Sequence, residues 1–541
     1  MVESPAPEHP LGQRGVPRPA GRPGARRRAE RPRRGTAAPD ARRLRGGERP
    51  ARRRVAVRRV AERLDAEPLP RPGPGADRRA QRRRPAVAGR ARGARPAEGA
   101  RPAGPLPADG EPVVSTVLGP GQARRRFVGL TALRWLPVGV AVPVSVLLAT
   151  ARGLSPAEIG VTVAVYGVVT LLLELPTGGL ADAIGHRPVL AASGLFTVAG
   201  LLTMAVADSV LLFSAAWALK GVARALDSGP LEAWYVDTVH ATAPAGDVTT
   251  GLSRAAAADA TGLTVGAVLG GALPLLLDRD GAEALAVPLL LAAALAAVHV
   301  AAVLLLVVPL PRAGGTGPAA LRAGVREVPA VIATTTRLVT RDRLLRALLL
   351  ISFLVGVVLT SLELLGPLHF AALAGSPEEG AAVFGVVTAV SFAAAAVGSL
   401  LAPALGRATR GSVVASSTVT SVLAAAAIVG VALAPGVVVA AGAYAVFYLL
   451  NAGAWPLRQQ LLHDRTTSAQ RSTTVSAKSL ALMLGGLLGN LLVPRLAEDA
   501  GLPAGLTVGA AAMLLVAVVS LGLATRREAE PATSVHPAPS G

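Results

Sequence analysis

From residue 127 onward the chain is a series of long apolar runs separated by short breaks. Each run reaches roughly the 20 residues that a helix needs to cross about 30 Å of hydrocarbon. The runs lack the alternation typical of a membrane β-barrel, so helices are the structure that satisfies their backbone in lipid. The predicted spans are 127–150, 157–177, 188–206, 209–237, 252–276, 284–309, 345–368, 380–401, 412–433, 436–456, 474–494 and 503–524. We therefore predict an all-α integral membrane protein with twelve transmembrane helices.

The longest break between runs, 310–344, separates the spans into two sets of six. This arrangement predicts two pseudo-symmetric six-helix bundles, 120–309 and 345–525, joined by a cytoplasmic central loop and followed by a tail at 526–541. Hydrophobic residues make up 51% of the chain and charged residues 16%, against about 25% charged in ordinary soluble proteins. This composition excludes a soluble globular enzyme.

No catalytic chemistry is indicated by the sequence. It contains no phosphate-binding G-x-x-x-x-G-K-[ST] loop, so we do not expect ATP to drive the protein directly. No metal-ligand set or pair of nucleophile and base stands out in a soluble portion. We therefore predict that the protein is not an enzyme and needs no cofactor or metal.

The front segment, 1–112, holds 29 Arg and 12 acidic residues, with many Pro and few large aliphatic residues. Such a composition is typical of disorder. Three interpretations stay open. In the first, the translation start is mis-assigned and the true start is Val113, Val114 or Val117. In the second, the segment is a genuine disordered tail, and in the third it is an arm that binds phosphate groups. It has no aromatic residue to stack on bases, so we expect no nucleic-acid partner.

Basic residues gather in alternate loops of the apolar body, which predicts its orientation. One set of loops and the tail contain Arg124 to Arg126, Arg187, Arg254, Arg407, Arg410, Arg458, Arg465, Arg471, Arg526 and Arg527. The central loop adds six more Arg, whereas the opposite loops hold mainly acidic residues. We therefore expect a multi-pass protein of the cytoplasmic membrane, with both termini and the central loop in the cytoplasm.

The loop after the second span contains Gly178, Asp182, Gly185 and Arg187 in the string GGLADAIGHR. This string resembles the G-x-L-a-D-r-x-G-r-[RK] signature of the major facilitator superfamily, in the loop where that family has it. His186 stands at one of the basic positions. The resemblance marks these residues as a gating-loop motif.

A degenerate copy of this motif follows the eighth span. It reads LAPALGR and ends at Gly406 and Arg407, with Pro403 in place of the Asp. Gly185 and Gly406 align when the two sets of six spans are superposed, as expected for two related halves.

The fifth span contains the string GLTVGAVLGG, with Gly262, Gly266, Gly270 and Gly271. It resembles the G-x-x-x-G-P-x-x-G-G motif of the superfamily's antiporters, with Ala267 where Pro is usual. Gly residues four apart allow helix backbones to approach closely. Both an exchange-specific role and plain close packing remain open for this motif.

The resemblance covers about 120–525 and implies a secondary transporter that alternates access to a site between the two bundles. The stretch 173–177 is similar to drug-efflux-like members. The resemblance therefore implies export of a small lipophilic molecule in exchange for protons, with the proton gradient as energy source. We expect the substrate, protons and the lipid bilayer as partners, and a monomeric protein. Uptake of a nutrient by a related facilitator or proton symporter is the alternative.

Three ionisable residues of the fourth span, Lys220, Arg224 and Asp227, fall within about 60° of one another on one helix face. Each costs about 2.5–3.5 kcal/mol to insert, so each is a functional candidate. Arg224 can form an internal pair with Asp227, which would leave Lys220 or Arg134 of the first span unpaired. An ion-pair cluster that joins the first and fourth helices is the structural alternative.

Two further acids are candidates for proton coupling. Asp259 lies in the fifth span, where it could instead pair with Arg254, and Glu363 lies toward the outer end of the seventh span. We expect that one of Asp227, Asp259 and Glu363 takes up the proton and that the nearby basic residues set its pKa. His299 in the sixth span is expected to serve in packing rather than in a proton relay.

Tyr444, Tyr448, Asn451 and Trp455 recur at spacings of four, three and four, hence on one face of the tenth span. An aromatic and amide stripe of this kind suits an amphipathic or lipophilic ligand. The same stripe could pack between helices, with Trp455 as an interfacial anchor. Both interpretations stay open.

Overall fold

The computed structural model describes residues 118–177, 180–309, 342–465 and 468–523. The chain divides into two units, 1–106 and 107–541, and every described residue belongs to the second. The predictions for 1–112, for Gly178, for most of the central loop and for the tail lie outside the described residues.

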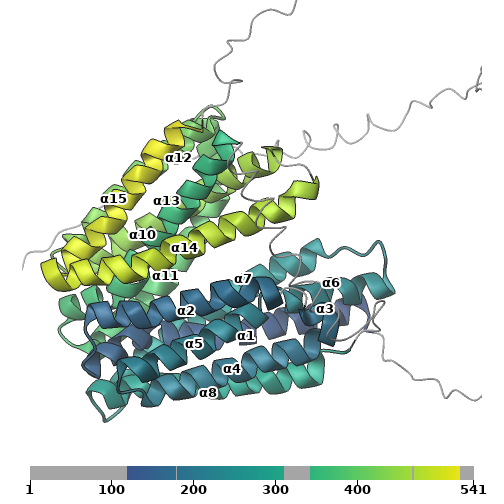
Figure 1. Ribbon diagram of the computed structural model, residues 1–541, viewed down its shortest axis with the longest axis horizontal. Coiled ribbons are helices and arrows are strands. Elements are labelled where there is room, and N and C mark those ends of the chain that lie inside the picture. The colour runs from purple at the N-terminus through teal and green to yellow at the C-terminus, as the bar shows by residue number, and fades with distance from the viewer. Residues whose placement is uncertain (1–117, 178–179, 310–341, 466–467, 524–541) are drawn as a thin grey trace, which may run out of the picture. The chain divides into compact units, whose positions relative to one another are not determined.

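Every regular element in these ranges is a helix, and Figure 1 shows their arrangement. The first half contains α1 (Pro120–Ala151), α2 (Pro156–Thr177), α3 (Leu180–Ile184), α4 (His186–Val206), α5 (Val210–Leu226), α6 (Pro230–Thr242), α7 (Thr249–Ala272) with a 3-10 continuation η1 (Leu273–Leu276), and α8 (Gly281–Leu306). The second half contains α10 (Arg343–Ala374), α11 (Pro377–Ala408), α12 (Val413–Ala432), α13 (Val437–Arg465), α14 (Ser468–Ala500) and α15 (Leu502–Leu521).

Eleven helices within the described residues are long and apolar enough to cross a membrane. The one remaining predicted span, the fourth (209–237), contains α5, which has 17 residues and includes Lys220 and Arg224. These twelve membrane helices confirm the predicted fold class. The long apolar runs form helices because helices satisfy all backbone groups inside lipid.

The two halves repeat the same packing pattern. In the first half α1 packs on α7 and α8, α2 packs on α5, and α4 packs on α5 and α8. In the second half α10 packs on α14 and α15, α11 packs on α13, and α12 packs on α13 and α15. Each pair in one half has its counterpart at the same place in the order of the other half. The two bundles are therefore structural repeats.

The fourth predicted span, 209–237, is not one helix. It breaks between α5 and α6, where Gly229 has φ of 128° and Pro230 opens α6. Pro lacks the N–H that would continue α5 and its ring favours a first helical turn, while Gly accepts the positive φ at low cost. Asp227 is consequently the residue that ends α5 rather than a position in the middle of a helix.

The two loop motifs also differ from their predicted setting. Gly406 and Arg407 lie in the last turn of α11, which runs past 401 to Ala408, rather than in a loop. Asp182 lies within the short helix α3, and Gly185 has φ of 98° immediately before α4. This positive φ explains a Gly at that position.

The two halves meet along α7 with α11 and along α2 with α14. Among the described residues, the hydrogen bonds that join the halves lie at the end where α1 finishes and α2 begins. There the amide of Ala157 donates to Glu498 at 3.1 Å, and the amide of Gly281 donates to Glu378 at 2.6 Å. This is the end that the loop charges predict to face outward.

Candidate functional site

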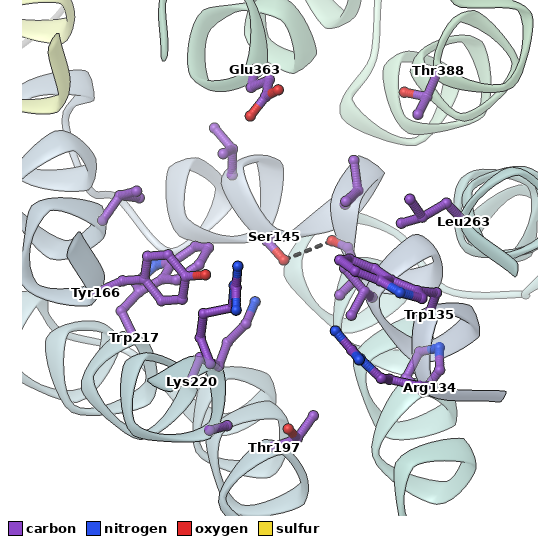
Figure 2. Close-up of a pocket in the computed structure, with 18 of the residues that line it drawn as sticks. Arg134, Trp135, Ser145, Tyr166, Thr197, Trp217, Lys220, Leu263, Glu363 and Thr388 are labelled. Carbon is purple, nitrogen blue, oxygen red and sulfur yellow. Dashed lines mark hydrogen bonds between the residues drawn. The ribbon is translucent and has the colours of Figure 1, made fainter. Parts of the chain in front are cut away.

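A cavity of about 560 Å³ lies between the two bundles. Its walls come from α1, α2, α4, α5, α7 and α8 of the first half and from α10, α11, α13 and α14 of the second. Figure 2 shows part of the lining. A volume in this range is typical of sites for small molecules. The contacts between the halves therefore enclose space for a ligand.

Arg134 of α1 forms an ion pair with Asp227 at the end of α5. Its Nε lies 2.6 Å from Oδ2 of Asp227, and both side chains line the cavity. The guanidinium also lies 5.1 Å from the ring centre of Trp135. The internal pair of Asp227 with Arg224 that the sequence allows is not formed, and the ion pair with Arg134 agrees instead with the structural alternative, in which ion pairs join the first and fourth helices. The pair links the first and fourth membrane helices.

Lys220 and Arg224 also line the cavity, and neither forms an ion pair or side-chain hydrogen bond with the described part of the chain. Nζ of Lys220 lies 4.1 Å above the ring of Trp217, which meets Tyr166 edge-on at 5.8 Å. Gly200 of α4 lies against the methylene stem of Lys220, where a side chain would clash. The ammonium is thus positioned by aromatic faces and a close backbone rather than by an acid.

Glu363 of α10 faces the cavity from the second half, across from Lys220 in Figure 2. The hydroxyl of Tyr448 donates to its Oε1 at 3.4 Å. The described residues include no cation paired with this carboxyl. Glu363 is therefore an acid of the cavity wall whose charge is not matched by a fixed neighbour.

The predicted stripe on α13 divides into two pairs. Tyr444 and Tyr448 stack at 5.3 Å and line the cavity. Asn451 and Trp455 lie outside the lining, and Trp455 instead lies beneath Lys478, whose Nζ is 3.6 Å from the ring. The stripe therefore has a cavity side and a packing side.

The remaining two candidates differ in position. His299 lines the cavity, and its buried Nδ1 has no hydrogen-bond partner in the part of the chain that is described. Asp259 does not line the cavity and forms no ion pair with Arg254 or with another described residue. The alternative pairing considered for Asp259 is therefore wrong.

The Gly motif of α7 lies at two helix crossings. Gly262, Gly266 and Gly270 lie against the backbone of α1, and a methyl group on any of them would overlap a carbonyl oxygen there. Gly271 faces the backbone of Ala381 on α11, in the other half. The motif thus packs α7 against its own bundle and, at its end, against the second one.

The loop motif near α3 is held to neighbouring helices. Nε2 of His186 lies 3.3 Å from Oδ2 of Asp237, and Arg187 donates to the carbonyl of Leu304. The side chain of Asp182 lies outside the described part of the structure. These contacts connect α4 to α6 and α8. They lie at the opposite end of the first bundle from the hydrogen bonds that join the two halves.

Several lining residues were missed by the sequence analysis. Hydroxyl and amide groups within apolar spans contribute to the wall, as do aromatic rings from α2 and α11. They include Ser145, Tyr166, Thr197, Thr360, Phe384, Thr388, Ser391, Phe392 and Asn490. Polar residues inside apolar runs are a usable signal, but their direction depends on helix rotation, which the sequence leaves open. The described residues contain no group of three or more His, Asp or Glu that could hold a metal ion.

A comparison with protein families matches residues 127–453 to the family described as the Major Facilitator Superfamily. This match covers more than half of the chain. The chain belongs to the Major Facilitator Superfamily. Membership makes it a multi-pass membrane transporter, which agrees with the superfamily resemblance seen in its motifs.

Solved structures of this superfamily share the fold. The nucleoside transporter NupG is 14% identical, with a TM-score of 0.61, and the match covers 74% of this chain and 98% of that one. A bacterial homologue of the human lysosomal transporter Spinster, in an inward-facing and occupied conformation, is 14% identical with a TM-score of 0.55, covering 74% and 93%. A search of curated protein sequences gives no match. At these identities the similarity establishes the fold and not the substrate.

Proposed function

We propose that this member of the superfamily exports a small lipophilic molecule across the cytoplasmic membrane in exchange for protons. The observation that supports this proposal is the cavity between the two bundles, which has ionisable side chains from both halves and is closed at one end by bonds between them. In alternating access, the halves rock around such a site so that it opens to one side at a time.

We assign proton coupling to Glu363. Its carboxyl faces the cavity, its described contact is one long hydrogen bond from Tyr448, and no described cation holds it in the charged form. A carboxyl in this setting can gain and lose a proton as water enters the cavity. Asp227, by contrast, is engaged by Arg134 and is assigned to holding α1 and α5 together.

Inside-out membrane vesicles provide the test. The vesicles are energised, their internal acidification is followed with a pH-sensitive dye, and a panel of lipophilic drugs is added. Proton-coupled export predicts that a substrate collapses the pH gradient in vesicles with the wild-type protein but not in vesicles without it. Glu363→Gln should abolish this response, since an amide cannot carry the proton.

Asp208→Asn is the matched control, because Asp208 is an exposed acid between α4 and α5. It should leave the response unchanged. A full response in Glu363→Gln with equal membrane expression would refute the assignment of Glu363. No response to any drug by the wild-type protein would refute export of lipophilic molecules with protons.

Uptake of a polar metabolite is the alternative function. The hydroxyl and amide groups in the cavity wall, among them Thr197, Thr388 and Asn490, favour it because they can bond to a polar substrate. Right-side-out vesicles separate the two functions. Accumulation of a labelled nucleoside or sugar under an inward proton gradient would support uptake and contradict export.

A further inference from the structure

The first half of the molecule offers positive charge to the cavity without a matching acid. Of its three cationic side chains in the lining, Arg134 forms an ion pair with Asp227, whereas Lys220 and Arg224 have no ion-pair partner among the described residues, and Arg224 interacts with Asp227 only at longer range. Arg224 is also exposed to the cavity. After internal pairing, two unmatched positive charges therefore remain on one wall.

These two cations form a single unit on α5. They are four residues apart in an uninterrupted helix, so they lie on one face with their Cβ atoms about 5–6 Å apart. Like charges at this spacing repel each other and weaken a helix, and neither side chain has an ion-pair partner among the described residues. Two donors at this separation can hold the oxygens of one carboxylate, sulfonate or phosphate group between them.

The rest of the cavity favours an apolar body on that anion. Trp217 and Tyr166 flank Lys220, and the wall from α11 and α13 presents aromatic rings, including Phe384, Phe392 and Tyr448. On the far side Glu363 would repel a second anionic group. The walls thus differ in charge from one side of the cavity to the other.

We propose that the transported substrate is an amphipathic organic monoanion. Its anionic group is bound between Lys220 and Arg224, and its apolar body lies against the aromatic wall of the second half. This inference rests on the proposed transport function and narrows its substrate class. In this proposal Lys220 and Arg224 select substrates that have a negative charge.

A pair of fluorescent probes tests the charge requirement. 1-Anilinonaphthalene-8-sulfonate and N-phenyl-1-naphthylamine share one aromatic skeleton and differ by the sulfonate. Their binding to the full-length protein in lipid nanodiscs is measured by equilibrium fluorescence, with empty nanodiscs as the baseline. We expect the wild-type protein to bind the sulfonate at least about 10-fold more tightly, the effect of one charge-assisted contact.

Lys220→Gln and Arg224→Gln should each weaken sulfonate binding about 10-fold or more and change binding of the neutral probe less than about 3-fold. The neutral probe reports that the cavity is intact, and the charge-conserving variant Lys220→Arg should retain the preference. Lys478→Gln is the matched control, because Lys478 also lies over a Trp ring in a membrane helix but outside the cavity lining. It should bind both probes like the wild type.

Three results would overturn the inference: equal affinity of the wild type for both probes, no binding of either, or a sulfonate preference that survives in the Lys220→Gln, Arg224→Gln double variant. A separate result would refute the transport proposal. Sulfonate binding without any proton response in vesicles would leave the anion site standing and refute proton-coupled export.

Discussion

At the scale of single residues, Asp227 is held asymmetrically. Its Oδ2 lies 2.6 Å from Nε of Arg134, while its buried Oδ1 has no partner among the described residues. Both side chains are largely removed from solvent, with 22% and 15% exposed for Arg134 and Asp227. Removal of either partner would therefore leave a charge in a poorly hydrated site, which costs more than the loss of one contact.

Asp227→Asn should lower the free energy of unfolding by about 3 kcal/mol because it leaves Arg134 without its counter-charge. Replacing both residues, as Arg134→Gln with Asp227→Asn, should restore part of that loss. Thermal unfolding of the purified variants in detergent measures both effects, with the exposed Asp208→Asn as control. If the double variant loses as much as the two single variants together, the residues do not interact and the assignment of the pair is wrong.

At the scale of elements, the spans could be predicted because hydrophobicity and length set where a chain crosses lipid. The break after Asp227 was missed because apolar residues resume directly after it, at Leu231, although Gly229 followed by Pro230 is a known sign of a helix end and a new start. The pairing of α1 with α5 depends on helix rotation and on this break, so residue types alone left open whether Asp227 pairs with Arg224 or with Arg134 of the first helix. Lys220, Arg224 and Glu363 could be identified from the sequence as charges in apolar spans. That all three line the same cavity could be seen only in the folded structure.

The crossing of α7 over α1 should be intolerant of added volume. Gly270→Ala would place a methyl group onto the carbonyl of Val140, and overpacking of this kind costs about 1–3 kcal/mol. Gly129→Ala in α1 is the control, since that position is open and exposed. Melting temperatures of the two variants should differ, with Gly129→Ala at or above the wild type. Equal stability of both would show that the helices are farther apart than the structure has them.

The turn between α5 and α6 should require Gly229 for a different reason. Its surroundings are open, but its φ of 128° is one that side chains rarely accept. Gly229→Ala should therefore cost about 1–3 kcal/mol through backbone strain, measured again by thermal unfolding. Gly442→Ala in α13, which has open space and an ordinary helical setting, should be tolerated. A neutral result for Gly229→Ala would mean that the break adopts another backbone conformation.

At the scale of the whole molecule, the two structural repeats enclose the cavity and are joined at one end. Among the described residues two hydrogen bonds join the halves, from the amide of Ala157 to the exposed Glu498 and from the amide of Gly281 to the half-buried Glu378. Hydrogen bonds to a charged group contribute about 1.5–3 kcal/mol each, so two of them can be broken when the halves separate. A rocking motion between two bundles requires such an end, because a strongly bonded one would hold the molecule in a single state.

A covalent link at this end should therefore stop transport. The chain contains no Cys, so Ala157→Cys with Glu498→Cys introduces a unique pair across the two halves. A short bifunctional thiol reagent cleavable by reduction should join them, arrest substrate-driven proton movement in vesicles, and release it when reductant is added. Ser155→Cys with Glu158→Cys is the control, because these residues are hydrogen-bonded within one half and a link there leaves the halves free to move. Transport that continues after complete cross-linking of the first pair would contradict alternating access by separation of the bundles at this end. Arrest by the control pair as well would attribute the effect to the reagent.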